Sequence, residues 1–400
     1  MEAATDSRSS SRLKAVLRDE ERVTPLELFF DLVFVLAITQ CTALMAADPS
    51  WEGLARGMLV LGVLWWCWIG YAWLTSVVDP EEGLVRIAMF AAMAALLVAA
   101  LAVPHVFNNT GLWFAGAYGS ARMAQIALML LASRGQPQLR HSTLTGILGS
   151  TVVAIAILAG ASQADGALQG GLWALALVLD MAGPFFWGVE GWQLAPGHFA
   201  ERHGLIVLIA LGESIVAVGA GAQAAVDLGV VTAAVLGMVV AAALWWLYFD
   251  VVAIVAARRL SRAEPGAEQN AIARDSFSYL HLPMVAGIVL LALGMKKTLA
   301  HVDHHLDLVP AFAMFGGTAL YLLAHVAFRW RNIHTLNRHR LLLAAVLAAL
   351  LPLMTKIDAL AALAVLAALL VLLIVYETIR FAERRERIRH QVAREMAAGN

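Results

Sequence analysis

The sequence has 400 residues, of which 61% are hydrophobic and only 14% are charged, and its mean hydropathy is +0.75. Ordinary soluble domains are roughly 45–50% apolar and about 25% charged, so this composition excludes a soluble globular protein and indicates an integral membrane protein. The formal net charge of −1 carries no information about partners, because in membrane proteins the placement of Lys and Arg matters more than their sum.

The chain begins with a polar segment, residues 1–25, which lacks the apolar core of about 7–15 residues that marks a cleaved signal peptide. We therefore expect the first helix to stay in the mature protein. Twelve mostly apolar stretches follow, each near the length of about 20 residues that a spanning helix needs. They are 26–46, 54–78, 84–104, 111–132, 142–161, 170–189, 203–222, 228–256, 277–296, 308–330, 339–356 and 358–380. A short gap separates the last two, and a re-entrant pair there would leave ten spans.

The positions of Lys and Arg favour an even number of spans. If the N-terminus is cytoplasmic, 23 of the 28 basic residues fall in inside segments or at inside helix ends. The outside loops then hold only Arg56, Lys296, Lys297 and Lys356, and Arg122 lies within a span. This distribution satisfies the positive-inside rule. The sequence thus predicts a multi-pass membrane protein with both termini in the cytoplasm.

Two short sequence matches share one offset of 180 residues. Glu21-Arg22 precedes the first predicted helix and Glu201-Arg202 precedes the seventh, while Leu64-Trp65-Trp66 is echoed by Leu244-Trp245-Trp246. The matches can arise by chance, or they can mark two parallel six-helix repeats about an axis along the membrane normal. The duplication predicts a first half at 26–189, a second half at 203–380 and a basic cytoplasmic tail at 381–400. The expected fold is an all-α bundle of about twelve spanning helices.

The first predicted helix carries acids in an apolar segment. At about 100° per residue, Glu27 and Asp31 lie some 40° apart, and Thr39 and Thr42 fall on the same side. A charge at mid-bilayer costs on the order of 2.5–3.5 kcal/mol on insertion scales, so this face should point into the bundle. A simpler interpretation for Glu27 is a helix start at Thr24, where an acid complements the helix dipole. Asp31 lies one turn deeper, where capping explains it less well.

The seventh predicted helix carries a second polar cluster. Arg202 and Glu213 are eleven residues apart, which returns to nearly the same face, and Ser214 follows Glu213. Gly212 and Gly219 predict a close contact with another helix here. Glu213 is either the structural partner of an arginine or a site for an ion or a proton.

Other ionisable residues are also predicted to lie within spans. Acids and bases occur in comparable numbers, so neutralisation by pairing between helices is the simplest expectation. We predict that Asp31 pairs with Arg122 or Arg86. Gly183-Pro184 should kink the sixth predicted helix, and broken helices can line binding cavities, although purely structural kinks are as common. The remaining intramembrane candidates are Arg86, Arg122, Asp180, Asp250, His281 and His325.

Several motifs carry less weight. Cys41 and Cys67 lie in apolar segments and are interpreted as core residues. The segment HVDHHLD (301–307) has a metal-binding composition but no recognised ligand spacing, so we expect no metal site. Packing also explains the tryptophans of residues 64–73 better than a stacking pocket does. No P-loop, dinucleotide fingerprint, nucleophile elbow or HExxH pattern occurs, so we expect no enzyme, no catalytic residue and no cofactor.

Two stretches carry a family resemblance. RVTPLELFFDLVFVLAITQ (22–40) and HFAERHGLIVLIALGESIVAVG (198–219) resemble the bacterial low temperature requirement A proteins, which are named after a cold-growth phenotype. The resemblance implies a multi-helix membrane protein of undefined molecular activity. A fainter likeness to two-repeat endolysosomal potassium channels fails at their Phe-Ser-Asp signature, since Phe30 is followed directly by Asp31. The residues that match the family motifs are Glu27, Phe30, Asp31, Glu201, Arg202, His203, Gly212, Glu213 and Ser214.

Two functions of different class remain. The first is transport or permeation of a small ion or solute along a path lined by the Glu27/Asp31 face and by Glu213/Ser214. The second is a membrane sensor or accessory protein in cold or stress adaptation, whose buried charges only hold helices together. A membrane-embedded enzyme lacks a catalytic constellation. The expected partners are the lipid bilayer and the small ion or solute, with no nucleic acid, and a homo-oligomer is left open.

Overall fold

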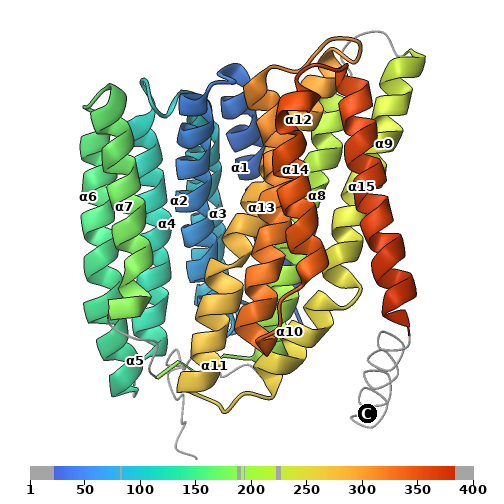
Figure 1. Ribbon diagram of the computed structural model, residues 1–400. Helices are drawn as coiled ribbons and strands as arrows, with labels where there is room; N and C mark the ends of the chain where they lie inside the picture. Colours follow the sequence, from blue (N-terminus) through green and yellow to red (C-terminus); the bar gives the residue numbers. More distant parts are fainter. Residues whose placement is uncertain are drawn as a thin grey trace, which may run out of the picture.

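The computed structural model of the protein describes residues 22–81, 83–134, 136–186, 191–192, 194–221 and 227–382 (Figure 1). Across these ranges the structure consists of helices and connecting turns, with one isolated β-bridge between His305 and Asp358 and no strand. Figure 1 shows the long helices running roughly side by side. The predicted all-α, polytopic bundle is confirmed.

We call α1 to α7 the first half and α8 to α15 the second half. The first half contains α1 (Pro25–Ala47), α2 (Trp51–Thr75), α3 (Gly83–Ala102), η1 (Val103–His105), α4 (Gly111–Ala132), α5 (Pro137–Ser142), η2 (Thr143–Leu148), α6 (Gly149–Ala161) and α7 (Gly166–Phe186). The segment η2 is a π-helix that joins α5 to α6.

The second half begins at α8, after residues 187–190, which lie outside the described ranges. It contains α8 (Pro196–Gly221), α9 (Leu228–Phe249), α10 (Val252–Ser261), α11 (Ala267–Ile272), η3 (Ala273–Tyr279), α12 (His281–Ala300), α13 (Leu308–Ile333), α14 (Arg338–Met354) and α15 (Ala359–Arg380). The segment η3 is a second π-helix and leads into α12.

Each of the twelve predicted spans corresponds to one long helix or helical run in the structure. Within the described ranges, ten of them are long and apolar enough to cross a membrane, and α4 and α14 lie alongside them in the same bundle. The α14 and α15 segments are two separate antiparallel helices. Large apolar side chains point outward around the bundle, among them Ile87 and Leu372. Such a surface suits lipid rather than water.

Capping residues fix where several helices begin. Thr24 accepts a hydrogen bond from the backbone of Glu27, and the Glu27 side chain accepts one from the backbone of Thr24, which completes a capping box before Pro25. Asp227 and Asn337 cap α9 and α14 through their side-chain oxygens. These caps satisfy backbone N–H groups that have no partner inside a helix.

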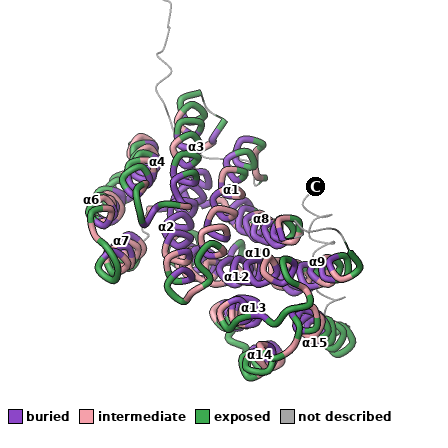
Figure 2. The backbone as a smooth tube through the Cα atoms, turned by 90° about the horizontal axis from the view of Figure 1, so that it is seen from above, coloured by how far each residue is buried: buried purple, intermediate pink, exposed green. Residues whose placement is uncertain are grey.

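The pattern of helix contacts in the first half recurs in the second. In the first half, α1 packs against α2 and α3, and contacts continue through α4, α6 and α7 back to α2. In the second half, α8 packs against α9 and α12, and contacts continue through α13, α14 and α15 back to α9. The halves meet where α1 lies beside α8, near the middle of the bundle in Figure 2. The duplication stays a prediction, and this recurrence favours it.

The closest helix packing is between α12 and α13. A Cβ atom on Gly287 would lie 2.6 Å from the backbone oxygen of Gly317, and one on Gly294 would lie 2.8 Å from the backbone of Met314. At Gly212 and Gly219, by contrast, a Cβ atom would have no neighbour within 4 Å. The predicted close contact at these two glycines is therefore wrong. Periodicity reveals the face of a helix but not how near its neighbour comes.

Gly287→Ala should therefore lower the free energy of unfolding by about 1–3 kcal/mol, because the new methyl group must push apart two backbones. The matched variant Gly212→Ala, in open space, should leave stability unchanged or raise it by up to about 1 kcal/mol through helix propensity. Thermal unfolding midpoints of the two purified variants in one detergent would measure the difference. Equal shifts in both variants would contradict this account of the α12–α13 contact.

Candidate functional site

Arg202 is the centre of a buried charge cluster between α1 and α8. Its Nη2 atom lies 2.5 Å from Oδ1 of Asp31, and its Nη1 atom lies 3.5 Å from Oε1 of Glu27. All three side chains are almost fully buried. The cluster joins the two halves, because the acids come from the first half and the arginine from the second. We call Glu27, Asp31, His198 and Arg202 the central cluster.

Further groups form hydrogen bonds with the central cluster, although Oδ2 of Asp31 and Nε of Arg202 have no partner among the described residues. Nε2 of His198 lies 2.8 Å from Oε1 of Glu27. Trp68 Nε1 donates to Oδ1 of Asp31 at 2.8 Å, and Arg202 Nη1 donates to the hydroxyl of Thr75 at 2.9 Å. Glu27 also belongs to the capping box of α1, so the capping and the buried-charge interpretations both hold for this residue.

His203 lies one residue further along α8, in an aromatic environment. Its Nδ1 lies 2.8 Å from the backbone oxygen of Phe199, which can only accept, so Nδ1 carries the hydrogen. Its ring contacts those of Trp68, Phe277 and His281, with centroid distances of 5.0–5.3 Å. His203 therefore packs beside the central cluster without touching either acid.

Arg122 and Asp180 form a second buried pair, inside the first half. Arg122 Nη2 lies 3.0 Å from Oδ1 of Asp180, which also accepts from the hydroxyl of Thr151 at 2.7 Å. Tyr118 donates to the other carboxylate oxygen of Asp180 at 2.6 Å, and Arg122 Nη1 donates to Gln125 at 2.5 Å. Four helical segments thus converge on one ion pair: α2 contributes the close backbone of Gly70, and α4, α6 and α7 contribute the side chains.

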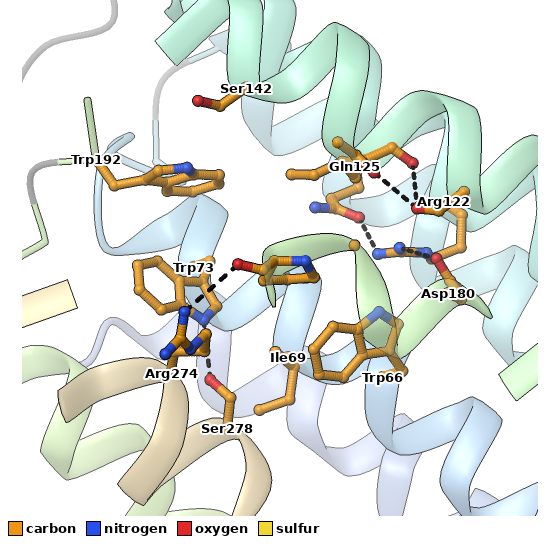
Figure 3. Close-up of a pocket in the computed structure, with 16 residues that line it drawn as sticks. Trp66, Ile69, Trp73, Arg122, Gln125, Ser142, Asp180, Trp192, Arg274 and Ser278 are labelled. Carbon is orange, nitrogen blue, oxygen red and sulfur yellow. Dashed lines mark hydrogen bonds and ion pairs between the residues drawn. The ribbon is translucent and has the colours of Figure 1, made fainter. Parts of the chain in front are cut away.

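A cavity of about 60 Å³ lies against this pair (Figure 3). Gly183 and Pro184 of α7 line it, and Trp66 and Trp73 of α2 form another wall. Figure 3 shows Arg274 and Ser278 of η3 closing the side opposite Arg122. We call this space the first-half cavity. A water molecule needs at least about 10–15 Å³ of such volume, so the cavity has room for a few waters or one very small ion.

Glu213 lies in the same α1–α8 interface as the central cluster but at a different level. It is 3% exposed, and its Oε2 atom lies 2.5 Å from the hydroxyl of Thr39 on α1. Within the described part of the chain, no Lys, Arg or His nitrogen lies within the 4 Å of an ion pair with Glu213. Ser214 beside it is fully buried, and its hydroxyl has no hydrogen-bond partner among the described residues.

The predicted partners of Asp31 are wrong. Asp31 pairs with Arg202, whereas Arg122 pairs with Asp180. Arg86 is exposed near the start of α3 and donates to the backbone oxygen of Glu81, so it does not pair with Asp31. Sequence periodicity placed Asp31 and Arg202 on inward faces, but it carried no information on which helices adjoin.

Sequence reasoning also missed part of the buried network. It left out His198, which lies in the resembling motif four residues before Arg202. It also counted Arg340 among the basic residues at inside helix ends and did not consider Glu377, although the two form a bidentate ion pair in which both side chains are 7% exposed. The signal that could have found the pair is the placement of each residue one turn inside an apolar helix.

The histidine-rich loop and the cysteines do not join these clusters. His304 and His305 are exposed, and each lies near an aspartate, Asp303 and Asp358 respectively. Among the described residues, no group of three or more His, Cys, Asp or Glu side chains is arranged to hold a metal ion. Cys41 and Cys67 are buried and unbonded to each other, in agreement with their interpretation as core residues.

Comparison with known proteins gives one family. Residues 22–375 match the profile of the bacterial low temperature requirement A protein. The chain is also 31% identical to an uncharacterised protein of Rhizobium meliloti (strain 1021). The aligned region has 314 residues and covers 76% of each of the two chains. No solved structure matches this chain. The matched range contains the central cluster, the Arg122–Asp180 pair and Glu213, and the chain therefore belongs to the bacterial low temperature requirement A family of membrane proteins.

Proposed function

We propose that this protein transports a small ion or solute across the bacterial inner membrane, with Glu213 as the group that takes up and releases the coupling proton or cation. The observation that carries the proposal is a carboxylate in the interface between the two halves with no cation at ion-pair distance in the described chain. A buried acid is costly in a membrane and usually marks an ion or proton pathway when it lacks a structural partner.

The hydrogen bonds of Thr39 support a proton-carrying role. Its hydroxyl lies 2.5 Å from Glu213 and 3.0 Å from the backbone oxygen of Val35, yet it has only one hydrogen to donate. If Thr39 donates to Glu213, the carboxylate is ionised. If Thr39 donates to Val35, the short contact requires Glu213 to be protonated and to donate to Thr39. The same pair of side chains therefore accommodates both protonation states without rearrangement of either helix.

The position of Glu213 suits alternating access. Asp31 and Thr39 are eight residues apart on α1, or about 12 Å along the helix, and Arg202 and Glu213 are eleven apart on α8, or about 16 Å. Buried apolar side chains occupy the levels between, including Phe34, Ile38 and Val207. Glu213 and the central cluster are thus two polar levels separated by an apolar layer. Movement of one half against the other would expose them in turn.

The central cluster and the Arg122–Asp180 pair have a different role in this proposal. Each acid there already faces an arginine at 2.5–3.5 Å, which suits a fixed joint between helices rather than a carrier. We propose that the central cluster holds the halves in register and that the Arg122–Asp180 pair fixes the helices within the first half. The orientation with both termini in the cytoplasm follows from the distribution of Lys and Arg along the chain.

Glu213→Gln should abolish coupled flux while the protein still folds, because glutamine keeps the size and hydrogen bonds of the side chain but cannot lose a proton. The measurement uses the full chain in liposomes under an imposed pH gradient, with internal pH dyes and tracer cations as readouts. Glu52→Gln is the matched control, since Glu52 is an exposed acid that pairs only with Arg56 one turn away on α2. It should transport like the unaltered protein.

The sensor or accessory function makes the opposite prediction. It is favoured by the three buried Arg–carboxylate pairs, which are the pattern expected of purely structural charges. If Glu213→Gln and the unaltered protein both give no flux above empty liposomes, and the variant instead changes the unfolding midpoint, the transport proposal is refuted. Flux that is equal in the unaltered protein and in Glu213→Gln would refute the role of Glu213 but not transport itself.

A further inference from the structure

A second cavity, of about 380 Å³, lies within the second half and is part of neither the central cluster nor the Glu213 level. Helices α9, α10, α13, α14 and α15 all contribute to its wall. Small-molecule sites in proteins commonly occupy 300–1,000 Å³, so this space is large enough for an organic ligand. We call it the second-half cavity. Its apolar wall includes Val251, Val255, Phe328 and Phe381.

His325 lines this cavity and has an unused hydrogen-bond donor. Its Nδ1 atom lies 2.7 Å from Nη1 of Arg340, and an arginine nitrogen can only donate, so Nδ1 must be the accepting nitrogen. The hydrogen of the neutral ring is then on Nε2. That atom has no partner among the described residues, although the side chain is only 2% exposed. A buried donor without an acceptor destabilises the folded protein, so this position favours a bound acceptor.

Asn332 presents the complementary group, an unused acceptor. Its Nδ2 atom donates to the backbone oxygen of Phe328 at 2.8 Å, which fixes the orientation of the amide. The Oδ1 atom has no partner among the described residues, and the side chain is 7% exposed. Asn332 and His325 lie seven residues apart on α13, two turns of one helix face, and both line the second-half cavity.

The ionised residues of the cavity wall carry equal numbers of positive and negative charges. Arg340 makes a bidentate pair with Glu377, at 3.1 Å and 2.9 Å, and also donates to the backbone oxygen of Leu247 at 3.1 Å. Arg329 and Asp250 add one charge of each sign. An anion or a cation would therefore meet no excess of opposite charge, and its loss of hydration would have no compensation.

We infer that the second-half cavity binds a small neutral amphiphile, a molecule with hydroxyl or primary amide groups on a short apolar chain. Its polar end accepts a hydrogen bond from Nε2 of His325 and donates one to Oδ1 of Asn332. Its apolar end packs against the valines of α10 and the phenylalanines of α13 and the chain segment after α15. The site is independent of the transport proposal, because no residue of the central cluster and neither Glu213 nor Thr39 lines it.

The probe is 1,2-hexanediol, whose hydroxyl groups can both accept and donate hydrogen bonds and which has a four-carbon apolar chain. With the full chain in lipid nanodiscs, the unfolding midpoint should rise in proportion to the logarithm of diol concentration above the Kd, as mass action requires when a ligand binds only the folded state. Sodium hexanoate and hexylammonium chloride, which have the same chain length and carry a charge, should give no such rise.

Two variants locate the site. His325→Phe keeps the ring but removes the donor, and should weaken diol binding roughly threefold to tenfold, the effect of one lost hydrogen bond. Val255→Trp fills the cavity from α10 and should abolish binding, and it keeps the test decisive if His325→Phe fails to fold. The matched control is His105→Phe, because His105 is exposed in η1, outside the cavity. It should bind the diol like the unaltered protein.

Three results would overturn the inference. One is the absence of any logarithmic rise of the unfolding midpoint with diol concentration, which would mean that the cavity holds water only. Another is tighter binding of hexanoate or hexylammonium than of the diol, which would contradict the neutral class of ligand. The last is equal diol affinity in the unaltered protein and in Val255→Trp, which would place the binding elsewhere, such as in the surrounding lipid.

Discussion

Arg202→Met should lower the free energy of unfolding by about 3–5 kcal/mol, because it leaves Glu27 and Asp31 buried together without their shared cation. Methionine fills most of the space of the arginine stem, so the loss reports charge rather than volume. The guanidinium also lies 5.4 Å from the ring centroid of Trp68, and that contact disappears as well. Folded yield and the thermal unfolding midpoint in detergent would measure the effect.

Two further variants separate charge from packing. Arg86→Met removes an exposed arginine from the start of α3 and should change the midpoint little. Adding Glu27→Gln and Asp31→Asn to Arg202→Met removes the uncompensated charges and should restore a large part of the lost stability. If Arg202→Met is as stable as Arg86→Met, the central cluster does not join the halves in the way the geometry indicates.

Asp180→Leu should destabilise the first half to a similar extent, by about 3–5 kcal/mol. It removes the counter-charge of Arg122 and the acceptor of Tyr118 and Thr151 in one step. The double variant Arg122→Met with Asp180→Leu should be more stable than Asp180→Leu alone, because replacing a whole buried pair by apolar groups is often close to neutral.

A double-mutant cycle over Arg122 and Asp180 provides the measurement, with thermal midpoints of all four proteins in one detergent. A coupling energy near zero would show that the two side chains do not interact in the folded protein. The conservative variant Asp180→Asn belongs in the same series, since it retains the acceptor for Thr151 while removing the charge. Its thermal unfolding midpoint should lie between those of the unaltered protein and Asp180→Leu.

The sequence was sufficient to predict the helices and the inward faces. Apolar stretches of about 20 residues are a strong signal, and all twelve correspond to long helices. Helical periodicity also placed Asp31, Arg202 and Glu213 on buried faces, and the structure confirms their burial. For Gly183-Pro184 a cavity-lining role and a purely structural kink were both left open, and both residues line the first-half cavity.

The sequence could not show which charged side chains on different helices pair with one another. Asp31 and Arg202 are 171 residues apart, and nothing in a single helix reveals which neighbour supplies its counter-charge. The same limit explains the error at Gly212, since closeness depends on the helix that lies opposite. Arg340 was counted as an interfacial charge because it lies near a helix end, whereas tertiary packing buries it against Glu377.

The apolar layer between the central cluster and Glu213 has an electrical consequence. In an energised membrane the potential drops mainly across the material of lowest dielectric constant, and moving one elementary charge through 100 mV changes its energy by about 2.3 kcal/mol. Phe34, Ile38 and Val207 are buried at the levels between Asp31 and Glu213, so under the proposed transport function the two acids should lie at different depths in the membrane field. In that proposal, the occupancy of Glu213 by a proton should respond to voltage as well as to pH, and the direction of the response reports the face from which the proton arrives.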